Sequence, residues 1–272
     1  KLDEVNRLNI ISYTLALIIL PLAYKFGFWG AMGTIIIQPL SYVVVAMFRN
    51  NELCPTSICF DINFIKYILS FGFIPFIGGI FSIIYLQVER WSISSLLGVE
   101  ALGEFYLVFL YVSLFQLIPT SINSIFFPKG VKSYTERQYV DFKIYIKYYY
   151  IILAGYALFI TIITVFFLKP VVSVVFPNHI SGVQYVYIIL PGLILSTLTD
   201  PINLILNASV ILKPMLFVSS TNMLFNVILV IGLIACGSFS LQGVAYVRLF
   251  SGLYMIVACV FVYFSIRRKL YV

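Results

Sequence analysis

Four charged side chains stand within or at the ends of long apolar runs, where a charge is costly and therefore suggests a function. They are Glu89, Arg90, Asp200 and Arg248. Guanidinium groups bind phosphate oxygens through paired hydrogen bonds. Arg90 and Arg248 are therefore candidates for holding an anionic group such as a diphosphate, and Asp200 is a candidate for coupling to a proton or a sodium ion.

Each of these charges also has a structural interpretation. Glu89 and Arg90 end an apolar run, where they would reach the outer headgroups or pair with each other. Arg248 lies about 10 Å below the outer end of a helix that starts at Leu241. There it would line a cavity or pair with an acid on another helix. Asp200 lies about 25 Å along its run, near the cytoplasmic boundary, where an acid needs no special role.

Neutral polar residues form two stripes at three- and four-residue spacing, which places each stripe on one helix face. The stripes are Ser113, Gln116, Thr120 and Asn123, and Ser219, Asn222 and Asn226. Such groups join neighbouring helices, or they surround sugar hydroxyls in a wet cavity. The candidate substrate-binding residues are therefore Arg248, Arg90, Glu89, Gln116, Asn123, Asn222 and Asn226.

The sequence gives no basis for a catalytic or metal site. Its one histidine, His179, lies in a turn, and the four cysteines have no metal-ligand spacing. We therefore expect no cofactor, no metal and no enzymatic activity. The net charge of +7 reflects basic loops rather than a nucleic-acid partner.

The elements that must position these residues are membrane helices. The chain is 62% hydrophobic, with a mean hydropathy of +1.05 and uncharged runs of about 20 residues, enough to cross a bilayer. Lipid offers backbone amides no partners, so such runs must be helical. The sequence predicts an all-α, polytopic helical bundle with spans at 8–24, 28–48, 67–88, 105–127, 148–168, 183–206, 215–236 and 241–266.

Most of the 17 lysines and arginines fall in the loops on the side that holds both chain ends. The positive-inside rule makes that side cytoplasmic, so we expect a multi-pass protein of the bacterial cytoplasmic membrane with both ends inside. The basic segment Lys129–Lys147 has the composition of a surface helix on anionic lipid, or of an ordinary cytoplasmic loop.

Residues 24–48 and 237–261 repeat the same order of features, with Gly30 aligned to Gly243. Repeats of this kind occur in transporters built from two halves. The offset predicts a six-helix C-terminal lobe at 64–272, a cytoplasmic linker at 49–63, and the last two helices of an N-terminal lobe at 1–48. Four more helices are then expected before residue 1, which makes the chain part of a two-lobe, twelve-helix transporter.

The stretch from Phe64 to Tyr134 carries a family resemblance. An acid and a base end a span at Glu89-Arg90, Gly98 follows in a short loop, and the next helix reads "LGEFYLVF", with "LFQLIPTSINSIFFP" at its other end. This layout resembles the Wzx-type polysaccharide or O-antigen repeat-unit flippases of the multidrug/oligosaccharidyl-lipid/polysaccharide (MOP) exporter superfamily.

The resemblance implies the flipping of a prenyl-diphosphate-linked oligosaccharide for O-antigen or capsule synthesis by alternating access. It implies a lipid-linked oligosaccharide, membrane lipids and the polysaccharide polymerase machinery as partners, with an unknown coupling ion. A multidrug or cation exporter of the same superfamily would share the layout, and an inactive truncated fragment is a third interpretation. A membrane glycan polymerase would need a longer external loop than the sequence provides.

Overall fold

The computed structural model describes residues 61–209 and 212–266, together with scattered positions between 11 and 44. About half of the residues in the predicted spans at 8–24 and 28–48, and most of the predicted linker, lie outside the described residues. The chain separates into two compact units, Lys1–Lys66 and Tyr67–Val272. The candidate residues all belong to the second unit.

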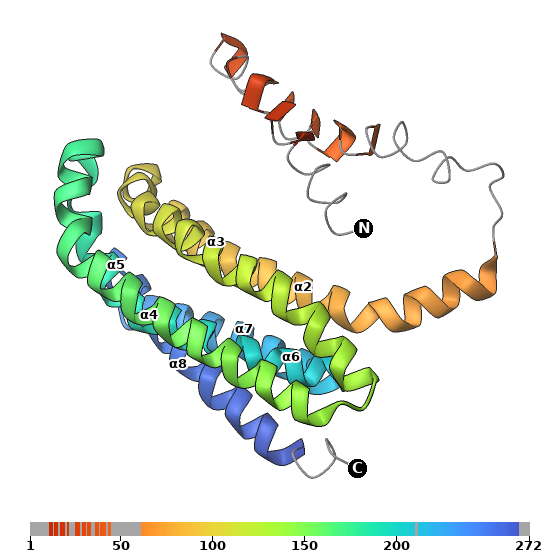
Figure 1. The fold of residues 1–272 in the computed structure, drawn as a ribbon. Coiled ribbons are helices and arrows are strands. Elements are labelled where there is room, and N and C mark those ends of the chain that lie inside the picture. The colour runs from red at the N-terminus through yellow and green to blue at the C-terminus, as the bar shows by residue number, and fades with distance from the viewer. Residues whose placement is uncertain are drawn as a thin grey trace. The chain divides into compact units, whose positions relative to one another are not determined.

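Every regular element in the described part of the chain is a helix (Figure 1). The elements are α2 (Ile62–Leu96), α3 (Val99–Thr135), α4 (Tyr139–Val175), the short 3₁₀ helix η2 (Pro177–His179), α5 (Gly182–Thr197), α6 (Asp200–Ala208), α7 (Leu212–Ala235) and α8 (Leu241–Ile266). Five described segments are long and apolar enough to cross a membrane. The predicted all-helical, multi-pass membrane bundle is confirmed.

Several helices are longer than the sequence predicts. Helices α3 and α4 have 37 residues each, about 55 Å of helix against about 30 Å of hydrocarbon. Helix α2 continues to Leu96 rather than ending at residue 88. The predicted spans therefore mark only the most apolar part of each helix.

The predicted surface helix over Lys129–Lys147 is wrong, because this segment is the end of an antiparallel helix pair. Helix α3 continues to Thr135 and α4 begins at Tyr139. Between them Arg137 has a positive φ of 59°, and the amide of Gln138 donates to the Ser133 carbonyl at 2.8 Å. This Schellman turn satisfies the last carbonyls of α3 and reverses the chain within three residues.

The predicted span at 183–206 corresponds to one apolar segment, Gly182–Ala208, that consists of two helices. Helix α5 ends at Thr197 and α6 begins at Asp200, with Pro201 in its first turn. Proline has no amide hydrogen to continue the preceding helix but fits the first turn of a new one. The break between the two helices therefore falls at residues 198–199, just before the Asp-Pro step.

Helices α5 and α8 approach closely because glycines face each other at their crossing. A Cβ atom on Gly192 would lie 2.9 Å from the Cα of Leu249, and one on Gly252 would overlap the carbonyl of Gly192. Small residues permit such close packing between membrane helices. The crossing fixes the position of Arg248, one helical turn before Gly252.

Substituting alanine for Gly252 is expected to destabilise the bundle by about 1–3 kcal/mol, because the backbones of α5 and α8 must separate to admit the methyl group. Thermal unfolding in detergent measures the effect. Gly155→Ala is the matched control, because a Cβ atom there meets nothing within 4 Å. Equal melting temperatures for the two variants would show that the close crossing is not required.

Candidate functional site

The centre of the candidate site is an ion pair between α2 and α8. Nη2 of Arg248 lies 3.0 Å from Oε2 of Glu89. Glu89 is 0% exposed and Arg248 is 4% exposed. A buried ion pair is costly to form and still more costly to break from one side. The sequence expectation that Glu89 pairs with Arg90 or reaches the headgroups is therefore wrong.

Helix register explains why these two residues meet. Glu89 lies seven residues before the end of α2 at Leu96, and Arg248 lies seven residues after the start of α8 at Leu241. At 1.5 Å per residue, each residue lies about 10 Å from that end of its own helix. The serines after Trp91 suggest a loop in the sequence, but they continue the helix and so place Glu89 inside the bundle.

Helix α7 adds an amide to the ion pair. Asn226 is fully buried, and its Nδ2 donates to Oγ of Ser251 at 3.3 Å. The side chains of Asn226 and Arg248 both lie close to the Glu89 carboxylate. Ser251 lies one turn after Arg248 on α8. Helices α2, α7 and α8 therefore meet in one polar cluster. The contact of Asn226 with Ser251 agrees with the interpretation that its stripe of polar residues joins neighbouring helices.

Phe109 of α3 lies beside both candidate arginines. Its ring centroid is 4.7 Å from Cζ of Arg90 and 5.6 Å from Cζ of Arg248, within the range of a cation–π contact. Arg90 itself is exposed. The two arginines therefore share an aromatic neighbour, but only Arg248 is buried in the bundle.

A pocket of about 240 Å³ lies beside the ion pair. Its polar lining comes from Ser82, Tyr85, Gln116, Ser196, Asn222, Arg248 and Ser251. The remaining lining residues are Leu86, Val112, Gly192, Leu193, Gly252 and Met255. Three of the candidate residues, Gln116, Asn222 and Arg248, thus come from three different helices to one pocket. Apart from the guanidinium, the polar lining is neutral.

Two polar atoms of pocket-lining residues are buried and have no hydrogen-bond partner among the described residues. They are Nη1 of Arg248, a donor, and Oδ1 of Asn222, an acceptor. Leaving such atoms unsatisfied costs about 1–3 kcal/mol each. A ligand that offers an oxygen acceptor beside a hydroxyl donor would satisfy both atoms.

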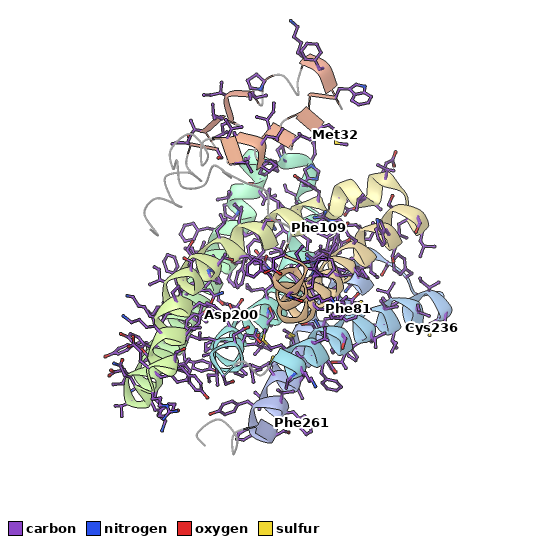
Figure 2. All side chains as sticks on the ribbon, turned by 90° about the vertical axis from the view of Figure 1, so that its right-hand side faces the viewer. Met32, Phe81, Phe109, Asp200, Cys236 and Phe261 are labelled. Carbon is purple, nitrogen blue, oxygen red and sulfur yellow. The ribbon has the colours of Figure 1, made fainter. Side chains whose placement is uncertain are left out.

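Two of the predicted residues lie elsewhere. Asn123 is half-buried on α3 and does not line the pocket. Asp200 is half-buried in the first turn of α6, near Tyr149 and Cys259. Figure 2 shows Asp200 and Phe109 at separate places in the bundle. The structure therefore does not unite Asp200 with the Glu89–Arg248 pair.

Sequence reasoning missed part of the lining. Tyr85 lies four residues before Glu89, Ser251 three residues after Arg248, and Gly252 four residues after it. These spacings place each on the same helix face as its charged neighbour, a signal that was present in the sequence. Nothing in the sequence, however, links Ser196 of α5 to this cluster.

Comparison with known proteins gives one informative result. No family model and no curated protein matches the chain. A crystal structure of MATE in the straight conformation matches with a TM-score of 0.62 and 16% sequence identity. The match covers 96% of this chain and 61% of the MATE chain. Since likeness at this identity concerns the fold, the chain is an all-helical membrane protein whose fold is similar to that of the MATE structure, and it spans about three fifths of that structure's length.

Proposed function

We propose that this chain belongs to a flippase that moves a prenyl-diphosphate-linked oligosaccharide repeat unit across the bacterial cytoplasmic membrane, for O-antigen or capsule synthesis. The headgroup enters a central cavity from the cytoplasmic leaflet, and the two lobes then rock so that the cavity opens to the outside. The prenyl tail stays in lipid throughout. No bond is made or broken.

The observation that carries the proposal is the pair of unsatisfied atoms in the pocket lining. Nη1 of Arg248 is a cationic donor suited to a phosphate oxygen, and Oδ1 of Asn222 accepts from a hydroxyl. The other polar lining groups are hydroxyls and the amide of Gln116. A glycosyl diphosphate supplies phosphate oxygens and hydroxyls next to each other.

The pocket volume limits how much of the headgroup is held at once. At about 240 Å³, the pocket is smaller than a typical site for a drug-sized ligand, about 300–1,000 Å³. It holds a diphosphate with a neighbouring sugar but not a whole oligosaccharide. The rest of the glycan would lie outside this pocket, on surfaces that include Asn123 and the exposed Arg90.

The direction of transport follows from the proposed orientation. The basic α3–α4 turn and both chain ends lie in the cytoplasm by the positive-inside rule, so the α7–α8 link faces outside. Asp200 stays a proposed coupling residue whose ion is unknown. It lies away from the pocket, so its protonation or sodium binding would act through helix movement rather than through contact with the headgroup.

A reconstituted flipping assay tests the proposal. Vesicles containing the full chain and a prenyl diphosphate with a short glycan are exposed to a membrane-impermeant lectin. We expect the inner-leaflet glycan to become accessible faster than in protein-free vesicles. A prenyl monophosphate carrying the same glycan should flip more slowly, because one phosphate forms fewer contacts with Arg248. Equal rates with and without protein would reject the flippase.

A multidrug or cation exporter is the second candidate, and the buried carboxylate favours it. Glu89 is an acid inside the bundle, which is a feature expected of an ion-coupled exporter. The same vesicles distinguish the two functions when loaded with a cationic dye. Dye efflux driven by a proton or sodium gradient, without glycan flipping, would favour the exporter.

A further inference from the structure

We propose that Glu89 is a positioning residue that holds Nη2 of Arg248 and thereby turns Nη1 toward the pocket. The inference rests on the proposed function and deepens it, because it says how the anion-binding group is oriented. It also changes the expected role of Glu89 from a residue that contacts the substrate to one that acts through Arg248.

The first support is the geometry of the contact. An arginine and a carboxylate can form two parallel hydrogen bonds. Here Oε2 lies 3.0 Å from Nη2 in an ion pair, while both carboxylate oxygens and Nη1 lack a hydrogen-bond partner among the described residues. The pair is therefore one-sided, and one arm of the guanidinium remains available.

The second support is the placement of the two groups. Arg248 lines the pocket, whereas Glu89 is fully buried and is not part of the lining. Helix α2 reaches the pocket through Ser82, Tyr85 and Leu86 instead. The acid therefore lies behind the base as seen from the pocket, and a bound anion would contact Arg248 without displacing Glu89.

The third support is the aromatic neighbour. Phe109 lies 5.6 Å from Cζ of Arg248 and is itself buried. A carboxylate and a ring on two different helices restrict the rotation of the guanidinium. Such a pre-oriented donor loses less conformational entropy when an anion binds.

The direction of the ion pair then determines what the pocket recognises. With the base on α8, a cationic donor meets the ligand, and with the acid on α8, a carboxylate would meet it instead. If the ion pair served only to join α2 to α8, exchanging the acid and the base would preserve both stability and ligand binding. If Glu89 positions Arg248, the exchange would preserve stability but lose ligand binding. This difference provides the test.

The experiment compares the full wild-type chain with Glu89→Arg, Arg248→Glu and the exchanged double variant E89R/R248E. The probe is prenyl diphosphate, with neutral prenol as its control, and melting temperature is measured alongside binding. We expect both single variants to melt lower than wild type. The exchanged pair should recover most of that loss but bind prenyl diphosphate at least tenfold more weakly than wild type. Recovery of binding together with stability would overturn the positioning role.

Glu89→Asp and Glu89→Gln refine the result. Aspartate keeps the charge but is one methylene shorter, so it should partly retain diphosphate binding. Glutamine keeps the shape without the charge and should bind more weakly than aspartate. If binding follows only the melting temperatures of the two variants, the role of Glu89 is structural and the inference is wrong.

An independent measurement separates the failure of this inference from failure of the proposed function. Nitrogen-15 NMR of the arginine side chains, with Arg248 assigned by its substitution, reports whether the guanidinium rotates. We expect distinct Nη signals in wild type and averaged signals in Glu89→Gln. Averaged signals in wild type would refute the positioning of Arg248. Distinct signals without preference for prenyl diphosphate over prenol would instead refute the proposed substrate.

Discussion

Replacing Glu89 by methionine is expected to lower the free energy of unfolding by about 3–5 kcal/mol, because the substitution leaves the Arg248 guanidinium buried without its counter-ion. Glu89 is completely buried and contacts Arg248 at 3.0 Å, so solvent offers little compensation. Unfolding in detergent, followed by circular dichroism during a thermal or denaturant titration, measures the loss.

The double variant E89M/R248M shows whether the loss arises from the unpaired charge. Replacing both partners of a buried ion pair by apolar residues of similar volume is often neutral or stabilising. We therefore expect the double variant to be at least as stable as wild type. Glu100→Met is the matched control, since Glu100 is exposed at the start of α3 and should change stability by less than about 1 kcal/mol. A double variant as unstable as Glu89→Met would show that the side chains matter for packing rather than charge.

Neutralising both partners as E89Q/R248Q is expected to weaken prenyl-diphosphate binding by about tenfold to a hundredfold. The basis is the contribution of a hydrogen bond between charged groups, about 1.5–3 kcal/mol, at about 1.4 kcal/mol per tenfold change. Two glutamines retain a hydrogen-bonding pair of similar length, so folding is less affected than by removing one charge. Binding to vesicles containing prenyl diphosphate measures the change, and the lectin assay measures the accompanying loss of flipping.

Lys132→Gln controls for the loss of positive charge as such. Lys132 is exposed near the end of α3 and pairs with Glu136 at 3.8 Å, an exposed contact that contributes little to stability. We expect its binding of prenyl diphosphate to match wild type. If Lys132→Gln and E89Q/R248Q lose binding equally, the general charge of the protein attracts the ligand and Arg248 has no specific role.

The same two residues show how far the sequence alone can identify the site. Their charges stand out within apolar runs, and the cost of burying a charge in lipid is enough to make Glu89 and Arg248 candidates by their positions along the chain. Helical spacing likewise groups Gln116 with its stripe on α3 and Asn222 with its stripe on α7. These arguments use only positions along a single helix, which is why they can nominate residues but not their partners.

Pairing between helices could not be predicted in this way. Glu89 lies within α2 because this helix continues eight residues past its apolar run, and the glycines at 192 and 252 place α8, which carries Arg248, against α5. Asn123 and Asp200 satisfy the same sequence criteria as the pocket residues, yet they lie elsewhere. Whether a polar residue joins helices, lines a cavity or faces outward depends on contacts between distant parts of the chain.

The sequence by itself determined that this protein is a bundle of membrane helices. Lipid offers no hydrogen-bond partners, so the backbone amides and carbonyls of these long apolar runs must bond to each other within helices. It also determined which side chains are too polar for their surroundings. Only the tertiary structure decided that the Glu89 carboxylate neutralises Arg248, and that one arm of that guanidinium is left for the pocket. The physical reason is that helix identity depends on local hydropathy, whereas the partner of a buried charge depends on how separate helices pack.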